Sequence, residues 1–440
     1  MDTLTAARAQ MGLSLGFHMV FAAFGIGLPL LMVIAEGLWL RTGRPHYLEL
    51  ARKWGKATGL LFAIGAVSGT ALSFELGLLW PVFMKFAGAA VGPAFALEGF
   101  AFFIEAIFLG LYLYGWDRLS PRAHWLAGIP VAVSGMLSGA IVVAVNAWMQ
   151  TPVGFERGPH GELVSVDPLA PFRTPSWVHL AVHSTLSCYT AVGFAVAGVY
   201  AAGLLRGRRD DYHRAGLTLA MLLGAAAALL MPLSGDLNGR VVAKHQPAKL
   251  AAMEALFETR AGAPLLIGGL PDPATGTVRF GLEIPYGLSL LAAHDPNAVI
   301  RGLNDFPSDE RPDVVWVHLA FQVMVGAGFL LAALGLWFLW AWWRGRVVES
   351  RRLLQALLLG SPLGFVALEA GWVVTELGRQ PWTVYGVMRT REAVTPAAEV
   401  TASLAVFTLL YLGLAAVLVV LLRRLATGGP SGAKGGSHAA

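Results

Sequence analysis

The chain has 440 residues, of which 56% are hydrophobic and only 13% are charged. Soluble domains carry nearer a quarter of charged residues, and apolar runs of about 20 residues, long enough to cross a bilayer, recur here. This composition excludes an ordinary soluble domain and predicts an all-α polytopic membrane protein. The net charge of +5 does not indicate binding to nucleic acid, because the basic residues lie in short loops between the apolar runs.

We expect the apolar runs to form a bundle of about nine transmembrane helices. Their approximate ranges are 12–40, 57–84, 94–115, 127–149, 176–205, 215–235, 313–343, 353–377 and 393–422. No cleavable signal sequence precedes the first run, so we expect it to remain as a helix. The single cysteine, Cys188, lies in an apolar run and excludes an internal disulfide.

Basic residues cluster after every second apolar run. They are Arg41, Arg44, Arg52, Lys53 and Lys56; Arg118 and Arg122; Arg206, Arg208, Arg209 and Arg214; Arg344, Arg346, Arg351 and Arg352; and Arg423 and Arg424. The loops rich in Lys and Arg usually face the cytoplasm. The pattern therefore predicts an outside N-terminus and a cytoplasmic C-terminus.

The chain divides into four predicted parts. These are helices 1–6 in residues 1–235, an extracytoplasmic loop in 236–312, helices 7–9 in 313–425, and a disordered tail rich in Gly, Ser and Ala in 426–440. Within the loop we expect an amphipathic helix at 248–258, a turn-rich run at 270–276 and a strand at 278–284. A structured loop against one face of a bundle is a reasonable place for a substrate site.

The strongest functional signal is the set of ionisable side chains inside apolar runs, because an intramembrane charge is costly and usually serves a function. Glu376 and Arg379 lie at the end of one such run, between Trp372 and Trp382. The alternative is an interfacial tryptophan belt with a surface ion pair. The physical arguments alone weigh the two interpretations equally.

Other apolar runs add further groups of this kind. They are His18, Glu75, Glu98, Glu105, His179, His183, His318, Met324 and Glu369, with Ser138, Asn146 and Asp236 as polar additions. Glu98 and Glu105 are seven residues apart and share one helix face, as do Glu369 and Glu376. Singly, such a histidine is more often interfacial and such a methionine is core filling. Together they can bind metal or haem or carry protons, and a His/Met pair is a known axial set for haem iron.

Several motifs resemble those of subunit I of the cytochrome bd-type quinol oxidases, over essentially the whole chain. The most specific is residues 371–382, GWVVTELGRQPW, which resembles the family's GWxxxExGRQPW. The others follow in register: EGFAFFIE at 98–105, GWDR at 115–118, NAWMQ at 146–150, VHS at 182–184, KLAAME at 249–254 and VMVG at 323–326.

The resemblance implies three haems and a quinol site. His183 and Met324 would be the axial ligands of a low-spin haem b. The other ligands would be His18 and Glu376, with Glu98 beside them, for a high-spin haem b and a haem d (or a further haem b). Trp372 would pack near these haems, and Arg379 would neutralise haem propionates. Lys249 and Glu254 would bind and deprotonate the quinol, whereas Glu105, Ser138 and Asn146 would carry protons from the cytoplasm.

The implied enzyme oxidises quinol near the outer face of the bacterial cytoplasmic membrane and reduces dioxygen to water with cytoplasmic protons. It generates a proton gradient without a pump. The resemblance also implies a second large membrane subunit and small single-span subunits. It leaves ubiquinol and menaquinol both open.

Two stretches depart from the commonest family pattern. Gln322 stands where many members have Arg, and residues 74–81, FELGLLWP, resemble the cyanide-insensitive branch, which leaves haem d and haem b both open. From the residues alone, an ion-coupled transporter or a haem-free assembly subunit are the alternatives. For Lys249 and Glu254, the default interpretation is a solvated face of a helix in a loop.

Overall fold

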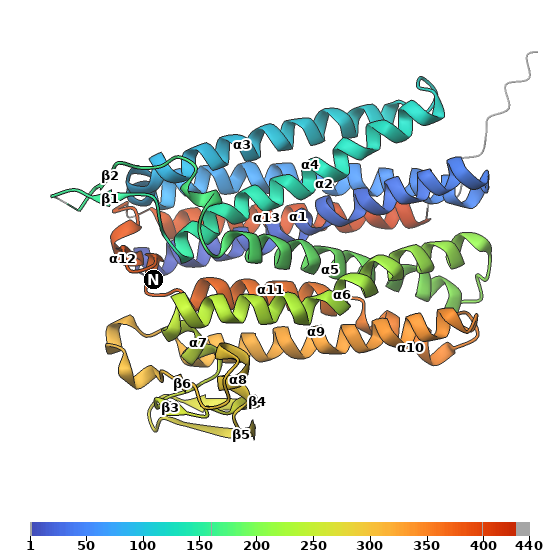
Figure 1. The fold of residues 1–440 in the computed structure, drawn as a ribbon. Coiled ribbons are helices and arrows are strands. Elements are labelled where there is room, and N and C mark those ends of the chain that lie inside the picture. The colour runs from blue at the N-terminus through green and yellow to red at the C-terminus, as the bar shows by residue number, and fades with distance from the viewer. Residues whose placement is uncertain (1, 160, 398, 428–440) are drawn as a thin grey trace, which may run out of the picture.

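Long helices lie side by side along one axis and form a single bundle (Figure 1). The computed structural model describes residues 2–159, 161–397 and 399–427. Within these ranges nine helical segments are long and apolar enough to cross a membrane, which confirms the predicted fold. They are α1 (Thr3–Thr42), α2 (Pro45–Leu79), α3 (Pro81–Tyr114), α4 (Pro121–Gln150), α5 (Trp177–Leu205), α6 (Asp211–His245), α9 (Val314–Trp343), the pair α10 (Arg351–Gly360) and α11 (Leu363–Leu377), and α13 (Val400–Thr427).

Several helix ends differ from the prediction. Helix α3 begins at Pro81 rather than near 94, because proline at the first position of a helix loses no hydrogen bond. Helix α6 continues to His245, whereas the sequence suggested an end at 235. Asp236 and Arg240 form an ion pair of 2.5 Å one turn apart, so the polar end of α6 remains helical. Of the predicted tail, residues 426–427 end α13, and residues 428–440 lie outside the described residues.

The eighth span is broken into α10 and α11 at Ser361 and Pro362. A proline ring cannot supply the N–H that a continuous helix requires. Helix α11 then packs tightly on α5. A Cβ added to Gly364 would lie 2.5 Å from the Ala191 Cα, so glycine is needed for this close approach.

The two ends of the bundle are connected differently. At the basic end, short turns at 43–44, 115–120, 206–210 and 344–350 join the helices. At the loop end, on the left of Figure 1, the connections are Trp80 alone between α2 and α3, and the longer segments 151–176, 246–313 and 378–399. Their elements are β1 (Glu156–Arg157), β2 (Leu163–Val164), α7 (Pro247–Met253), β3 (Arg260–Ala261), β4 (Leu265–Asp272), β5 (Thr277–Ile284), α8 (Gly287–Ala293), β6 (Val299–Ile300), β7 (Trp382–Val384), β8 (Met388–Arg389), α12 (Thr390–Ala393) and three short 3-10 turns.

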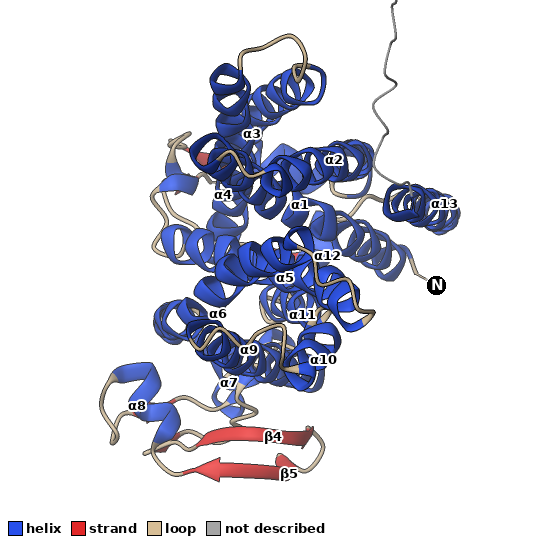
Figure 2. Ribbon diagram, turned by 90° about the vertical axis from the view of Figure 1, so that its right-hand side faces the viewer, coloured by secondary structure: helices blue, strands red, loops and turns tan. Residues whose placement is uncertain are grey.

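Strands β4 and β5 form an antiparallel hairpin in register from Leu265 opposite Ile284 to Asp272 opposite Thr277. Figure 2 shows it outside the helices, on the side where α7 and α9 lie. The predicted strand at 278–284 corresponds to β5, but β4 was missed. Gly268 and Gly269, both with positive φ, and Pro271 interrupt the apolar pattern that identifies a strand.

A buried ion pair joins α1 to α4 towards the basic end. His124 Nδ1 lies 2.7 Å from a Glu36 carboxylate oxygen, and its Nε2 lies 2.8 Å from the Tyr112 carbonyl oxygen. The side chains of His124 and Glu36 are 2% and 0% exposed. Both ring nitrogens therefore face acceptors, and the pair connects three helices. Neither residue lies in a motif that identifies it from the sequence.

Replacing His124 with alanine is expected to lower the free energy of unfolding by about 3–5 kcal/mol, because Glu36 is left as an unpaired buried charge. Thermal unfolding of the detergent-solubilised complex measures the effect. The double variant Glu36→Gln/His124→Ala should recover part of the loss, and His294→Asn, at an exposed loop position, should change nothing. Equal stability of the single and double variants would contradict the ion-pair account.

Candidate functional site

Helix α7, at the loop end, is buried from Ala248 to its last residue, Met253. Lys249 is 4% exposed and Glu254, which directly follows the helix, is 6% exposed. The expectation of a solvated, amphipathic helix at 248–258 is therefore wrong. The helix is short, ending at Met253, and packs between α6 and α9. Two ionisable groups are thus held away from water outside the transmembrane helices.

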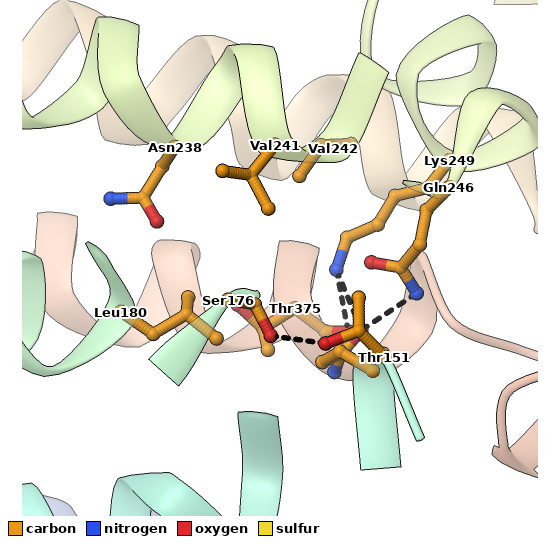
Figure 3. Close-up of a pocket in the computed structure, with 10 residues that line it drawn as sticks. Thr151, Ser176, Leu180, Asn238, Val241, Val242, Gln246, Lys249 and Thr375 are labelled. Carbon is orange, nitrogen blue, oxygen red and sulfur yellow. Dashed lines mark hydrogen bonds between the residues drawn. The ribbon is translucent and has the colours of Figure 1, made fainter. Parts of the chain in front are cut away.

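The Lys249 side chain extends from α7 towards the ends of α4 and α11 (Figure 3). Its Nζ donates to Gln150 Oε1 at 3.1 Å and to the Thr375 carbonyl at 3.2 Å. Burial lowers the pKa of Lys249 to about 7; the charge of Glu376 opposes this shift and that of Arg379 adds to it. A water-sized cavity of about 20 Å³ adjoins the amine. Its polar lining consists of Gln150, Thr151, Ser176, Asn238, Gln246, Lys249 and Thr375.

A chain of hydrogen bonds runs from Lys249 to Glu376 through the end of α4. Gln150 accepts from Lys249 and donates to Asn146 Oδ1 at 3.4 Å. Asn146 donates to Glu376 Oε1 at 2.5 Å, and Arg379 pairs with the other carboxylate oxygen. Lys249, one of the two expected quinol residues, and the expected haem-ligand segment therefore form one polar network. Gln150 is the central member of this network, and in the sequence it is only the last residue of the NAWMQ motif.

The guanidinium of Arg379 is incompletely paired. Arg379 is 3% exposed, and its Nε and Nη1 atoms have no hydrogen-bond partner among the described residues. Buried polar atoms are almost always paired, so these two donors indicate an anionic group that binds here. A haem propionate, the partner implied for Arg379, has this chemistry.

The histidines expected as haem ligands are each oriented by a serine. His183 Nδ1 lies 3.1 Å from Ser234 Oγ, and His18 Nδ1 lies 2.9 Å from Ser68 Oγ. A ligating histidine usually makes such a hydrogen bond with its other ring nitrogen. A glycine also lies next to each ring. A Cβ added to Gly235 would lie 3.8 Å from the His183 ring, and a Cβ added to Gly69 would lie 3.0 Å from the His18 ring.

The remaining expected ligands lie on α9 and α11. A Cβ added to Gly371 would lie 3.0 Å from the Met324 sulfur, so Met324 packs directly on α11. Trp372 is the next residue along α11. A Cβ added to Gly12 of α1 would lie 3.9 Å from the Trp372 ring, so this ring packs on α1. These contacts bring α1, α9 and α11 together around the segment that carries Glu376.

The expected proton-carrying residues separate into two places. Ser138 donates to Glu98 at 3.1 Å, and Glu105 lies two turns further towards the basic end on the same face of α3. Asn146 lies instead at the loop end, against Glu376. Glu75 accepts hydrogen bonds from Gln10 and Ser14 of α1.

Among the described residues, no group of three or more His, Cys, Asp or Glu side chains is arranged to hold a bare metal ion. The candidate ligands occur as single side chains on different helices. That arrangement suits a haem, whose porphyrin supplies four of the iron ligands and leaves one or two axial positions for the protein.

Comparison with known proteins decides the family. Residues 6–430 match the family model for cytochrome bd terminal oxidase subunit I. The chain belongs to this family. Members of the cytochrome bd terminal oxidase subunit I family are haem-containing quinol oxidases of the respiratory chain, so this protein is a subunit of a membrane-bound enzyme that pairs with a subunit II. Membership sets aside the transporter alternative.

Individual members of the cytochrome bd family cover almost the whole chain. A Bacillus subtilis (strain 168) protein provisionally named cytochrome bd menaquinol oxidase subunit I is 37% identical over 96% of both chains. A second protein of that organism, cytochrome bd ubiquinol oxidase subunit 1, is 32% identical over 96% of this chain and 93% of its own. The solved structure of the bd oxidase from Geobacillus thermodenitrificans is 40% identical, with a TM-score of 0.92, over 98% of this chain and 99% of its own.

Proposed function

We propose that this subunit oxidises quinol beside Lys249 and Glu254 and conveys the electrons to haems held by its helices, where dioxygen becomes water. The observation that supports this is the burial of Lys249 and Glu254 outside the transmembrane helices, together with the polar network from Lys249 to Glu376. Two quinols release four electrons and four protons, which match what one dioxygen needs to form two waters.

Glu254 is the proton acceptor in this proposal. Burial raises the pKa of Glu254 to about 8, and the backbone N–H of Leu266, which lies against the carboxyl, opposes the shift. A carboxylate with such a pKa accepts a proton more readily than an exposed glutamate does. Lys249, with three rotatable donor hydrogens when charged, orients a quinol oxygen by hydrogen bonding. Its tie to Gln150 and Thr375 fixes where that donor lies.

We assign the haem sites to the residues that the structure orients for them. His183 and Met324 would hold a low-spin haem b, and His18 and Glu376, with Glu98 nearby, would hold a high-spin haem b and a haem d or further haem b. When bound, these groups supply the electron transfer and the oxygen chemistry. The serine partners of both histidines and the two unpaired nitrogens of Arg379 support the assignment.

We further propose that the loop end faces outward and the basic end faces the cytoplasm of a bacterium. All the clustered basic residues lie at or near the basic end, as the charge rule for cytoplasmic loops requires. Quinol protons then leave on the outside, whereas Glu105, Glu98 and Ser138 supply cytoplasmic protons for water formation. Opposite sides for the two reactions generate a proton gradient without a pump. Small single-span subunits complete the proposed assembly.

Haem content and quinol-dependent oxygen uptake of the purified complex with subunit II test the proposal together. We expect a pyridine haemochrome spectrum with three haems per subunit I, and oxygen uptake driven by ubiquinol-1 or a menaquinol analogue. A colourless complex refutes the haem assignment. A coloured complex that consumes no oxygen with either quinol refutes the oxidase function.

The rate of quinol oxidation is expected to depend on the ionisation of Glu254. Because burial raises the pKa of Glu254 to about 8, the carboxyl is protonated and inactive as a base at lower pH. The value of kcat/KM for quinol should therefore rise about tenfold per pH unit up to about pH 7 and then level off as Lys249, whose pKa burial lowers to about 7, loses its charge. In Glu254→Gln this limb should disappear, while a limb retained in that variant would assign it to another group.

A further inference from the structure

Gln322 of α9 uses both ends of its amide to hold the β4 strand. Its Oε1 accepts from the Gly268 backbone N–H at 2.8 Å, and its Nε2 donates to the Leu266 carbonyl at 3.0 Å. The Gln322 amide therefore satisfies one backbone N–H and one backbone carbonyl of β4, as the backbone of a neighbouring strand would. An arginine at this position would possess donors but no acceptor for the Gly268 N–H.

His318, one turn earlier on α9, holds the same region from a second point. It is 0% exposed, with Nδ1 2.8 Å from the Met253 carbonyl oxygen and Nε2 3.0 Å from the Gly268 carbonyl oxygen. Both ring nitrogens face carbonyl oxygens, so the ring connects the end of α7 to β4. The His318 side chain is thus fully enclosed by the protein.

The backbone segments held in this way are those on either side of Glu254. Met253 directly precedes Glu254 in the chain, and the Leu266 N–H lies against the Glu254 carboxyl. Gln322 is in turn two residues before Met324 on the same helix. One helix thus carries a proposed haem ligand and also fixes the backbone around the proposed proton acceptor.

Apolar packing contributes little to holding the hairpin in place. In β4 only Leu266 and Pro271 are fully buried, and in β5 nearly every residue is exposed. Leu266 belongs to the same buried apolar cluster as Val314 and Val317 of α9. His318 and Gln322 add three hydrogen bonds between β4 and α9 to this limited apolar contact.

We propose that His318 and Gln322 are positioning residues for quinol oxidation, which fix Glu254 relative to the Met324 segment of α9. The inference rests on the proposed role of Glu254 as proton acceptor. Neither residue needs to touch the quinol; each acts through the backbone at Met253, Leu266 and Gly268.

Hydrogen–deuterium exchange and quinol kinetics of the intact complex with subunit II test this inference in the double variant His318→Phe/Gln322→Leu. We expect the amides of residues 265–272 to exchange at least about tenfold faster. The KM for ubiquinol-1 should rise about tenfold, while kcat changes less and the haem spectrum stays the same. The single variant His318→Gln, which keeps side-chain donors, should recover part of the lost protection.

Asp272→Asn is the matched control, because it breaks the exposed Arg279–Asp272 pair on the same hairpin without touching α9. It should leave both readouts unchanged. If the double variant does not fold, Gln322→Arg is used instead. In this variant only the Gly268 N–H loses its partner, so only the exchange of the Gly268 amide should become faster. Unchanged exchange at residues 265–272 overturns the docking role.

A parallel Glu254→Gln measurement separates this inference from the proposed function. If Glu254→Gln slows quinol oxidation but the double variant leaves KM unchanged, the positioning role is overturned and the quinol site stands. If Glu254→Gln is fully active, the proposed quinol site itself fails.

Discussion

Replacing Glu254 with glutamine is expected to slow quinol oxidation at least about 100-fold, because an amide cannot accept the proton that a general base removes. Glutamine has nearly the same size and shape as glutamate, and the native carboxyl is held largely neutral by burial. The helices and their haems should therefore be unaffected. Oxygen uptake with ubiquinol-1, followed beside the haem spectrum, measures the effect.

Glu258→Gln provides the control for this experiment. Glu258 lies four residues further along the same segment and is exposed, so the same chemical change there should have no effect. Loss of haem in Glu254→Gln, rather than loss of turnover, would contradict the role of Glu254 in quinol chemistry and point to a structural role.

Replacing Met324 with leucine is expected to abolish the low-spin character of one haem and to slow quinol-dependent oxygen uptake by at least about tenfold, because leucine has no sulfur to bind iron. Leucine and methionine have similar volumes, so the packing against Gly371 should survive. The reduced-minus-oxidised spectrum of the complex measures the change, and the haem content should stay near the native value unless the haem dissociates.

Met221→Leu makes the same substitution in the core of α6, where Met221 is 0% exposed. Its spectrum should match that of the native complex. An unaltered spectrum in Met324→Leu would refute the assignment of Met324 as an axial ligand, whatever the change in stability.

Hydropathy predicted the helical bundle well, because the length of an apolar run is a direct consequence of bilayer thickness. It failed where polar residues remain helical, as at Asp236 and Arg240, which neutralise one another one turn apart. It also failed at β4, where Gly268 and Pro271 interrupt the apolar pattern by which a strand is predicted. In both places the structure depends on contacts between particular side chains or backbone groups, and an average of hydropathy along the chain does not contain them.

The proposed site residues stand in sequence motifs, whereas their distant partners cannot be predicted from the motifs. Glu376 and Lys249 are visible in the sequence, but Gln150, which joins them, reaches Lys249 across 99 positions. His318 reaches Gly268 across 50 positions and Gln322 reaches Leu266 across 56. Spacing along one helix or strand reveals none of these contacts. The burial of Lys249 likewise depends on α6 and α9 enclosing α7.

The connection of β4 to α9 also constrains the order in which parts of the protein can fold during synthesis. The segment at 253–268 leaves the ribosome before residues 318 and 322, its anchors, and chains fold as they emerge. Until α9 is synthesised and inserted, Met253 and Gly268 lack their partners. The backbone around Glu254 is therefore completed only when the helix that carries Met324 is in place, so the two proposed sites mature together during biogenesis.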